Sequence, residues 1–413
     1  MQTRLADWIR DTPRGEEADA ILRRCVHCGF CLATCPTYNL LGDELDSPRG
    51  RIYLVKQMLE GAPVTRRTQL HLDRCLTCRA CETTCPSGVE YGKLADIGRA
   101  VVAEKVARRP GDRLLRWVLA RTLVSRGLFG AALRLGRLMR PVLPSALARK
   151  IPARRTQGAW PPARHARRMV VLTGCVQASI APSINAAAAR VLDRIGISLV
   201  DAPEAACCGA VPFHLDRQDD GLAHARANID AWWPHVESGA EAIVITASGC
   251  GTMVKDYGHH LAGDAAYAAK AARISALAKD VSEVVAAERE GLAALLRAAP
   301  RDPDPKARRI AFHSPCTLQH GQRINGVVEP ILAEAGFALT AVPDAHLCCG
   351  SAGTYSLLQP EISKALLHNK VRALESGDPE RVATANIGCL AHIASGASVP
   401  VVHWIELLDE RLG

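Results

Sequence analysis

Short apolar runs followed by helical patterns recur along the latter part of the chain. Residues 169–172, 243–245, 310–312 and 382–384 are such runs, and each is followed within a few residues by a cysteine next to glycine or proline. Residues 185–195 then repeat apolar positions at helical spacing. Apolar runs of this length that alternate with helices are typical of parallel α/β layers, so we predict that fold here.

The cysteines of this region form two copies of one pattern. A single cysteine is followed after 31 residues by Cys-Cys-Gly, and then after 41 or 39 residues by another single cysteine. The two sets are Cys175, Cys207, Cys208 and Cys250, and Cys316, Cys348, Cys349 and Cys389. Equal spacing over such a distance indicates duplicated modules of roughly 100 residues each, and the polar residues 301–308 are their predicted linker.

Each single cysteine is expected just beyond the carboxyl end of a strand, where open α/β sheets place their sites. Thiols can also be buried simply as small apolar groups. Packing alone does not explain why adjacent cysteines precede glycine twice at equal spacing. Metal or cluster ligation is therefore the better interpretation.

Two further runs near the N-terminus have the spacing C-x2-C-x2-C-x3-C-P. Their residues are Cys25, Cys28, Cys31, Cys35 and Pro36, and Cys75, Cys78, Cys81, Cys85 and Pro86. This is the spacing of bacterial ferredoxins with two [4Fe–4S] clusters. Three cysteines two residues apart let one loop hold three corners of an iron–sulfur cube, while the fourth points to the other cube.

The fourth cysteine of each run is therefore expected to cross over. One cluster should be bound by Cys25, Cys28, Cys31 and Cys85, and the other by Cys75, Cys78, Cys81 and Cys35. Two zinc sites are the alternative, but zinc usually takes two C-x2-C pairs separated by a longer loop. The insert between the runs predicts a larger, partly helical ferredoxin domain. Its Arg49 and Arg51 either contact an acidic group of a partner or stabilise the negative charge of a cluster, or they are ordinary surface residues.

The composition is that of a multidomain protein with metal centres. The chain has 413 residues, of which 48% are hydrophobic and sixteen are cysteine. Disulfides are rare where thiols are kept reduced. No apolar run approaches the roughly 18 residues of a membrane span, and the charged N-terminus does not resemble a secretory signal. We expect a cytoplasmic protein of mixed α+β and α/β class. The predicted parts are a helical two-[4Fe–4S] ferredoxin-type domain (1–105), a basic helical linker (106–166) and two cysteine-rich α/β modules (167–300 and 301–413).

Positive charge is concentrated between the two cysteine-rich regions. Residues 105–168 contain seventeen Lys or Arg against one acid, Asp112, so this segment carries +16 although the whole chain carries only +9. Residues 113–140 interleave leucines with arginines and predict amphipathic helices with a break near Gly127. Three interpretations stay open: helices packed on the protein with a solvated basic face, docking on an anionic membrane surface, and nucleic-acid binding. The last lacks stacking aromatics and a recognised fold, so no nucleic acid is predicted as a partner.

The chain shows no site for organic chemistry of its own, and we predict no catalytic residue. It has neither a dinucleotide fingerprint nor a Walker A loop. His313, His346 and His403 are interpreted as structural histidines with satisfied hydrogen bonds. A chain with clusters and no flavin site is expected to serve a flavin-bearing partner.

An N-terminal pair of ferredoxin motifs followed by two Cys-Cys-Gly modules resembles the iron–sulfur subunits of glycolate oxidase. The architecture is also similar to the C subunits of anaerobic glycerol-3-phosphate dehydrogenase and to heterodisulfide reductase subunits. The length and residues 47–51 favour glycolate oxidase. The resemblance implies an electron-transfer subunit of a glycolate dehydrogenase complex. Its FAD-containing 2-hydroxy-acid oxidase partners would oxidise glycolate to glyoxylate, and also D-lactate, for a respiratory acceptor. The protein is then also expected to bind a quinone or the cytoplasmic face of the inner membrane.

One departure concerns the heterodisulfide reductases, the basis of the alternative function as a quinone or disulfide reductase. In that family each module ends in C-x-x-C, and five cysteines hold non-cubane clusters. Here Cys250 is followed by Gly-Thr-Met and Cys389 by Leu-Ala-His, so the fifth cysteine is missing from both modules. Four thiolates suit an ordinary iron–sulfur cluster or a structural zinc. We expect metal in at least one module, two [4Fe–4S] clusters in the ferredoxin domain, and FAD only on the partner.

Overall fold

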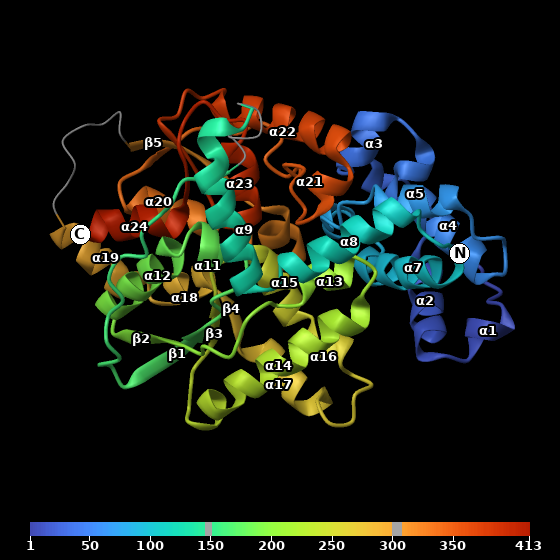
Figure 1. Ribbon diagram of the computed structural model, residues 1–413, viewed down its shortest axis with the longest axis horizontal. Helices are drawn as coiled ribbons and strands as arrows, with labels where there is room; N and C mark the ends of the chain where they lie inside the picture. Colours follow the sequence, from blue (N-terminus) through green and yellow to red (C-terminus); the bar gives the residue numbers. More distant parts are fainter. Residues whose placement is uncertain (145–150, 300–307) are drawn as a thin grey trace.

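The computed structural model describes residues 1–144, 151–299 and 308–413. The predicted linker 301–308, apart from Arg308, and the predicted boundary between the two modules therefore lie outside the described residues. Figure 1 shows a helical N-terminal part beside two α/β parts.

The N-terminal part is built from helices around α7. Its elements are α1 (Asp7–Arg10), α2 (Pro13–Arg24), η1 (Phe30–Leu32), α3 (Pro36–Leu41), η2 (Glu44–Asp46), α4 (Pro48–Leu59), α5 (Arg66–Asp73), α6 (Ala80–Thr83) and α7 (Tyr91–Lys105). α7 packs against α2, α4 and α5, and its Leu94 is fully buried. Pro13 and Pro48 begin α2 and α4, where a missing N–H costs nothing. The side chains of Thr12 and Ser47 cap these two helices.

Two exposed helices follow, α8 (Pro110–Thr122) and α9 (Arg126–Met139), and then η3 (Arg140–Val142). The predicted break near Gly127 lies slightly earlier, at residues 123–125, and Gly127 is inside α9. The reason is Ser125, whose side chain accepts a hydrogen bond from the Leu128 amide and so caps the new helix. α8 is attached to the body through Arg116, which is buried and pairs with Asp112 and Asp216.

Two four-stranded sheets follow, and they have the same topology. The strand orders are β2-β1-β3-β4 and β6-β5-β7-β8, and every pairing is parallel. The first module contains β1 (Arg167–Val171), α11 (Gln177–Ile180), α12 (Ser183–Arg194), β2 (Ile197–Asp201), α13 (Ala210–His214), α14 (Gln218–Glu237), β3 (Ile243–Ile245), α15 (Ser248–Lys255), α16 (Tyr257–His260), α17 (Ala268–Leu277), β4 (Ala278–Asp280), α18 (Val281–Ala287) and α19 (Arg289–Ala298). The second contains β5 (Arg309–His313), η5 (Thr317–Gly321), α20 (Val328–Glu334), β6 (Ala338–Leu339), α21 (Tyr355–Leu358), α22 (Pro360–Glu375), β7 (Arg381–Thr384), α23 (Ile387–Ala394), β8 (Val401–His403) and α24 (Trp404–Leu412). The parallel sheets agree with the predicted α/β layers.

The two modules share one hydrophobic core. α12 of the first module packs against α24 of the second, and apolar residues of both sheets belong to the same buried cluster. The Arg190 guanidinium pairs with the Asp409 carboxylate at 2.5 Å across this contact. The Ser248 amide donates to the Ala385 carbonyl at 3.1 Å. The carboxyl ends of the central strands of both sheets therefore face a common space.

Within the described ranges, no helix combines the length and the apolar character that crossing a membrane requires.

Candidate functional site: two ferredoxin loops and two cysteine-rich modules

The two ferredoxin loops have the same backbone shape. His27 and Gly29 in the first loop have φ angles of 55° and 86°, and Thr77 and Arg79 in the second have 53° and 59°. These are the second and fourth residues after the first cysteine of each run, so equal spacing produces equal turns. A left-handed backbone is costly for residues other than glycine. We attribute its repetition to the need to turn three cysteines of one run toward the same space.

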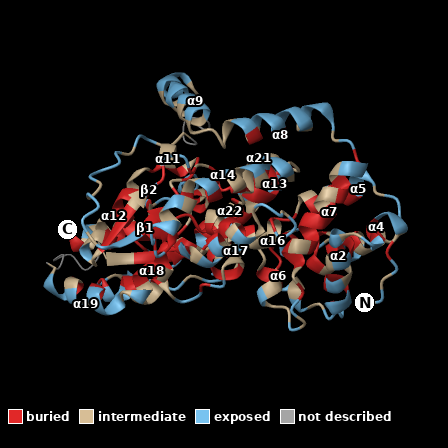
Figure 2. Ribbon diagram, turned by 90° about the horizontal axis from the view of Figure 1, so that it is seen from below, coloured by how far each residue is buried: buried red, intermediate tan, exposed pale blue. Residues whose placement is uncertain are grey.

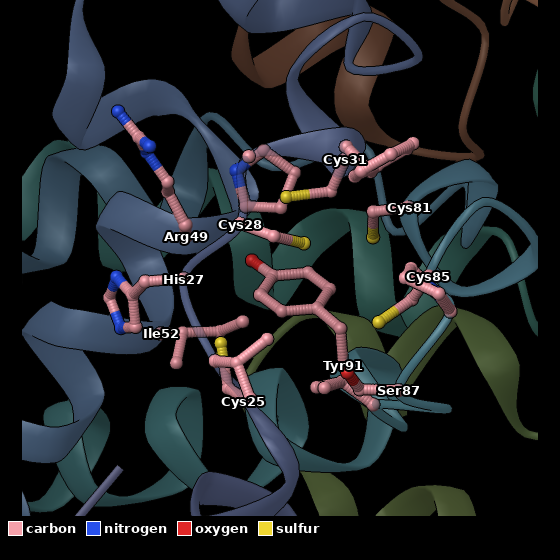
Figure 3. Close-up of a pocket in the computed structure, with 16 residues that line it drawn as sticks. Cys25, His27, Cys28, Cys31, Arg49, Ile52, Cys81, Cys85, Ser87 and Tyr91 are labelled. Carbon is pink, nitrogen blue, oxygen red and sulfur yellow. The ribbon is translucent and has the colours of Figure 1, made fainter.

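The sulfurs of the first group surround a small cavity (Figure 3). Its lining includes Cys25, Cys28, Cys31 and Cys85, together with Cys81. Cys85 comes from the second run, so the structure brings together the four cysteines that were predicted to share a cluster. Cys28 is exposed, whereas Cys25 is buried. One edge of this group is therefore open to solvent.

The second group lines another, adjoining cavity. Its cysteines are Cys35, Cys75, Cys78 and Cys81, so one member again comes from the other run. Tyr91 lines both cavities, and its hydroxyl donates a hydrogen bond to the Cys75 sulfur at 3.5 Å. Four thiols drawn from two such runs are the donor set of a [4Fe–4S] cluster, so the residues around each cavity fit that cofactor.

Arg51 is a core residue, whereas Arg49 is half-buried and lines the cavity of the first group. Arg51 is 1% exposed, and it donates to the His71 carbonyl at 2.7 Å and to the Asp46 carboxylate at 3.3 Å. Arg49 pairs with the partly exposed Glu44. The structure thus separates two arginines that the sequence alone left equivalent.

Buried cations favour the thiolate form within the second group. Burial raises the pKa of Cys75, but Arg51 and Arg99 outweigh this effect and hold the pKa below its usual range. Burial raises the pKa values of Cys78 and Cys81 well above the usual range, and neighbouring thiols add to the rise. Because a nearby positive charge favours an anionic group, Arg51 and Arg99 would also stabilise the negative charge of a thiolate-bound cluster.

The cysteines of both modules meet at one larger cavity of about 570 Å³. Its sulfur lining includes Cys175, Cys207, Cys208, Cys250, Cys316, Cys348, Cys349 and Cys389. The single cysteines follow the carboxyl ends of β1, β3, β5 and β7, which is the expected position for a site in an open α/β sheet. Cys75 lines the same cavity, so it adjoins the ferredoxin part.

The position after each cysteine pair requires glycine for two reasons: its backbone is left-handed, and no space is left for a side chain. Gly209 and Gly350 have φ angles of 89° and 87°, in the left-handed region that favours glycine. A Cβ atom on Gly350 would lie 2.8 Å from the Ser363 carbonyl oxygen, and one on Gly209 would be closer still to the Gly221 carbonyl oxygen. The glycine thus lets each cysteine pair pack against the following long helix, α14 or α22.

The second module packs its cysteines against the Cys75 group. Cys316, Cys348, Leu76 and Tyr355 belong to one buried apolar cluster, and Cys78 contacts it. The Tyr355 hydroxyl donates to the carbonyl of Arg74, next to Cys75, at 3.0 Å. The Cys316 and Cys348 sulfurs are 3.7 Å apart. Thiols of the ferredoxin part and of the second module are therefore neighbours.

Sequence analysis missed two buried polar residues of the second module. His313 was interpreted as satisfied, but neither of its ring nitrogens has a hydrogen-bond partner among the residues that the structure describes, so that interpretation is wrong. Burial lowers its pKa to about 3, which leaves the ring neutral at pH 7. Lys370 is also buried, and it donates to the Asp344 carbonyl at 2.7 Å. A single histidine or lysine in an apolar context carries no local pattern by which it could have been found.

His403 agrees with the structural interpretation. Its Nε2 lies 2.8 Å from the Thr246 carbonyl oxygen, and its Nδ1 accepts a hydrogen bond from the Ile405 amide at 3.2 Å. Both ring nitrogens are thus used in joining β8 to the first module and in capping α24.

Comparisons with known proteins find a ferredoxin-type region followed by two cysteine-rich regions. A family model described as a 4Fe–4S dicluster domain matches residues 21–89, and one described as a cysteine-rich domain matches residues 169–255 and 310–394. The glycolate oxidase iron–sulfur subunit of Escherichia coli is 55% identical over 100% of this chain and 99% of its own length. A probable glycolate oxidase iron–sulfur subunit of Bacillus subtilis is 29% identical over 95% and 94%. Lactate utilization protein A of Geobacillus kaustophilus is 27% identical over 55% of this chain and 92% of its own length.

The crossed arrangement predicts that Cys35→Ser behaves like Cys78→Ser. Both changes remove a thiolate from the second group, so each should abolish the same EPR signal of the reduced, anaerobically prepared protein. Cys28→Ser serves as the control, because it removes a thiolate from the first group and should leave a different residual spectrum. A Cys35→Ser spectrum that matches Cys28→Ser instead would show that each run binds its own cluster.

The two arginines predict a matched pair of stability effects. Arg51→Met removes a buried partner of Asp46 and should lower the free energy of unfolding by about 3–5 kcal/mol. Arg49→Met breaks an exposed ion pair, which is worth at most about 1 kcal/mol. Urea denaturation followed by cluster absorbance and far-UV circular dichroism measures both. Equal effects of the two substitutions would refute the core role of Arg51.

Proposed function

Because the chain belongs to the family of glycolate oxidase iron–sulfur subunits, we propose that it passes electrons from a flavin-bearing catalytic subunit, which oxidises glycolate to glyoxylate, towards a respiratory acceptor. Relatives named for lactate utilization support D-lactate as a second substrate of the complex. When bound, two [4Fe–4S] clusters supply sites for one-electron steps, while the two-electron oxidation belongs to the partner's flavin. The cysteines around the two small cavities are the proposed ligands.

The exposure of Cys28 carries the proposal for where electrons enter. Cys28 is exposed, and its neighbours Val26 and Phe30 are 67% and 64% exposed, although both are apolar. Apolar side chains that surround an accessible functional group are typical of protein interfaces. We place the flavin-bearing subunit on this surface, because it gives the partner its shortest approach to the first group of sulfurs.

The opposite end of the ferredoxin part supports an exit toward the second module. Cys78 packs against the buried cluster that contains Cys316 and Cys348, so thiols of the second group adjoin those of the second module. Tyr91 lines the cavities of both ferredoxin groups. The order of electron carriers that we propose is therefore the first group, the second group and then the second module.

We also propose that α9 attaches the protein to an anionic membrane surface. α9 buries none of its residues, and Leu128, Leu135 and Leu138 on it are exposed. Positions separated by seven and three residues share one face of a helix. Figure 2 shows α8 and α9 exposed along one side of the molecule. The net charge of +16 on the surrounding segment favours anionic lipid headgroups beneath such an apolar face.

The proposed docking surface predicts that Val26→Gln with Phe30→Gln weakens binding to the flavin-bearing subunit at least about tenfold, since buried interface aromatics contribute more than about 1 kcal/mol each. Affinity purification of the co-expressed full chain measures the retained flavoprotein, and iron content should not change. Leu135→Gln with Leu138→Gln is the control, because it removes equally exposed apolar groups elsewhere. Failure of the unaltered chain to retain any flavoprotein would refute the proposed function.

In a test of membrane binding the two double variants exchange roles: Leu135→Gln with Leu138→Gln is the test, and Val26→Gln with Phe30→Gln is the control. The α9 double variant should bind vesicles that contain phosphatidylglycerol at least about tenfold more weakly than the unaltered chain, because full burial of a leucine contributes roughly 1.5–3 kcal/mol and about 1.4 kcal/mol is already a factor of ten. The Val26 and Phe30 double variant should bind as tightly as the unaltered chain. Co-sedimentation with vesicles measures both. Equal binding to purely zwitterionic vesicles, or no binding at all, would contradict an anionic lipid as the occupant.

A further inference from the structure

A buried histidine without hydrogen-bond partners lies beside the sulfurs of the second module. His313 is the last residue of β5 and is 2% exposed. Both of its ring nitrogens lack a partner among the described residues. A buried polar group left unpaired costs about 1–3 kcal/mol, and such groups in native proteins generally meet an ion, a ligand or a water molecule.

The position of His313 identifies a metal as the missing partner. One ring nitrogen of His313 and the sulfurs of Cys349 and Cys389 lie within 4.8 Å of one another. Imidazole and thiolate are donors that zinc sites and certain iron–sulfur clusters both use. We propose that His313 is a metal ligand, so that the second module offers four thiolates and one imidazole to a centre of iron or zinc.

The first module has no equivalent donor. Leu172 precedes Cys175 by three residues, as His313 precedes Cys316. The strand pairing gives the same equivalence between Leu172 and His313. His313 pairs with Thr384, the last residue of β7. Val171 pairs with Val244, so the next residue, Leu172, lies at the level of Ile245, the last residue of β3. The modules therefore share a fold but differ in their donor sets: four thiolates in the first, and four thiolates plus an imidazole in the second.

The surroundings of His313 suit a metal-bound imidazole. Thr384, its register partner, also has a buried hydroxyl that finds no hydrogen-bond partner within the described ranges. Metal-bound histidines usually donate their other ring N–H to a neighbouring acceptor, and paired residues of adjacent strands lie on the same face of a sheet. Once one ring nitrogen binds metal, we expect the Thr384 hydroxyl to accept from the other.

A neutral imidazole in the donor set changes what the centre can do. Histidine in place of thiolate raises the reduction potential of an iron–sulfur cluster. An iron centre that takes His313 in place of one of the four thiolates would therefore accept electrons from the all-thiolate ferredoxin groups, whereas a zinc centre would have a structural role only. This inference rests on the proposed metal binding by the modules, but not on the identity of the substrate or of the flavin partner.

The test uses the full chain, purified anaerobically from cells grown with 15N-labelled histidine or with natural histidine. Metal content is measured by mass spectrometry. Pulsed EPR detects histidine nitrogen coupled to a paramagnetic iron centre, and X-ray absorption at the zinc edge detects it on zinc. The variants are His313→Leu, which copies Leu172 of the first module, and His313→Cys, which restores a soft donor. His368→Leu is the control, because His368 is an exposed histidine of the same module.

Histidine nitrogen should be detected in the unaltered chain and in His368→Leu, and lost in both His313 variants. His313→Leu should lose at least half of the metal that Cys389→Ser loses, whereas His313→Cys should retain it. Metal that depends on Cys389 but shows no histidine nitrogen in the unaltered chain would overturn the inference, and this result needs no variant at position 313. Absence of any metal beyond the ferredoxin clusters would overturn both the inference and the proposed metal binding by the modules.

Discussion

The need to gather many thiolates in a small, partly dry space constrains the whole molecule. Eight sulfurs from two runs converge on two cavities that Tyr91 lines in common, and burial together with neighbouring thiols raises the pKa values of Cys78 and Cys81 well above the usual range. Arg51 and Arg99 offset this cost at Cys75. Arg51 is held in turn by Asp46 and by the helices around α7. The ferredoxin part is thus a scaffold that keeps positive charge beside its sulfurs.

The same constraint explains the glycine in each Cys-Cys-Gly sequence. Adjacent cysteines can both face one cavity only if the chain turns sharply after them, and Gly209 and Gly350 supply this turn with their left-handed backbone. The close approach of α14 and α22 then leaves no room for a side chain. Duplication preserved this backbone device in both modules, while the residues around it diverged, as Leu172 and His313 show.

The three cysteine-rich parts are arranged so that one ferredoxin group is exposed and the other contacts the second module. Cys28 lies at an exposed edge flanked by apolar side chains, and Cys78 lies in a buried contact with the second module. α8 and α9 extend along a separate surface (Figure 2). The surfaces proposed for the catalytic partner and for the membrane therefore consist of different residues.

The sequence by itself determined the features that depend on short spacing. The cysteine runs indicated ferredoxin loops, the repeated apolar runs indicated parallel sheets, and the interleaved leucines and arginines indicated amphipathic helices, whose exposure the sequence left open. Only the tertiary structure decided that Arg51 is buried while Arg49 is not, that Cys78 meets Cys316, and that His313 lies beside Cys389. The physical reason is separation along the chain. Spacing within a loop or a helix follows from backbone geometry, whereas contacts between residues far apart depend on how whole elements pack and leave no periodic pattern in the sequence.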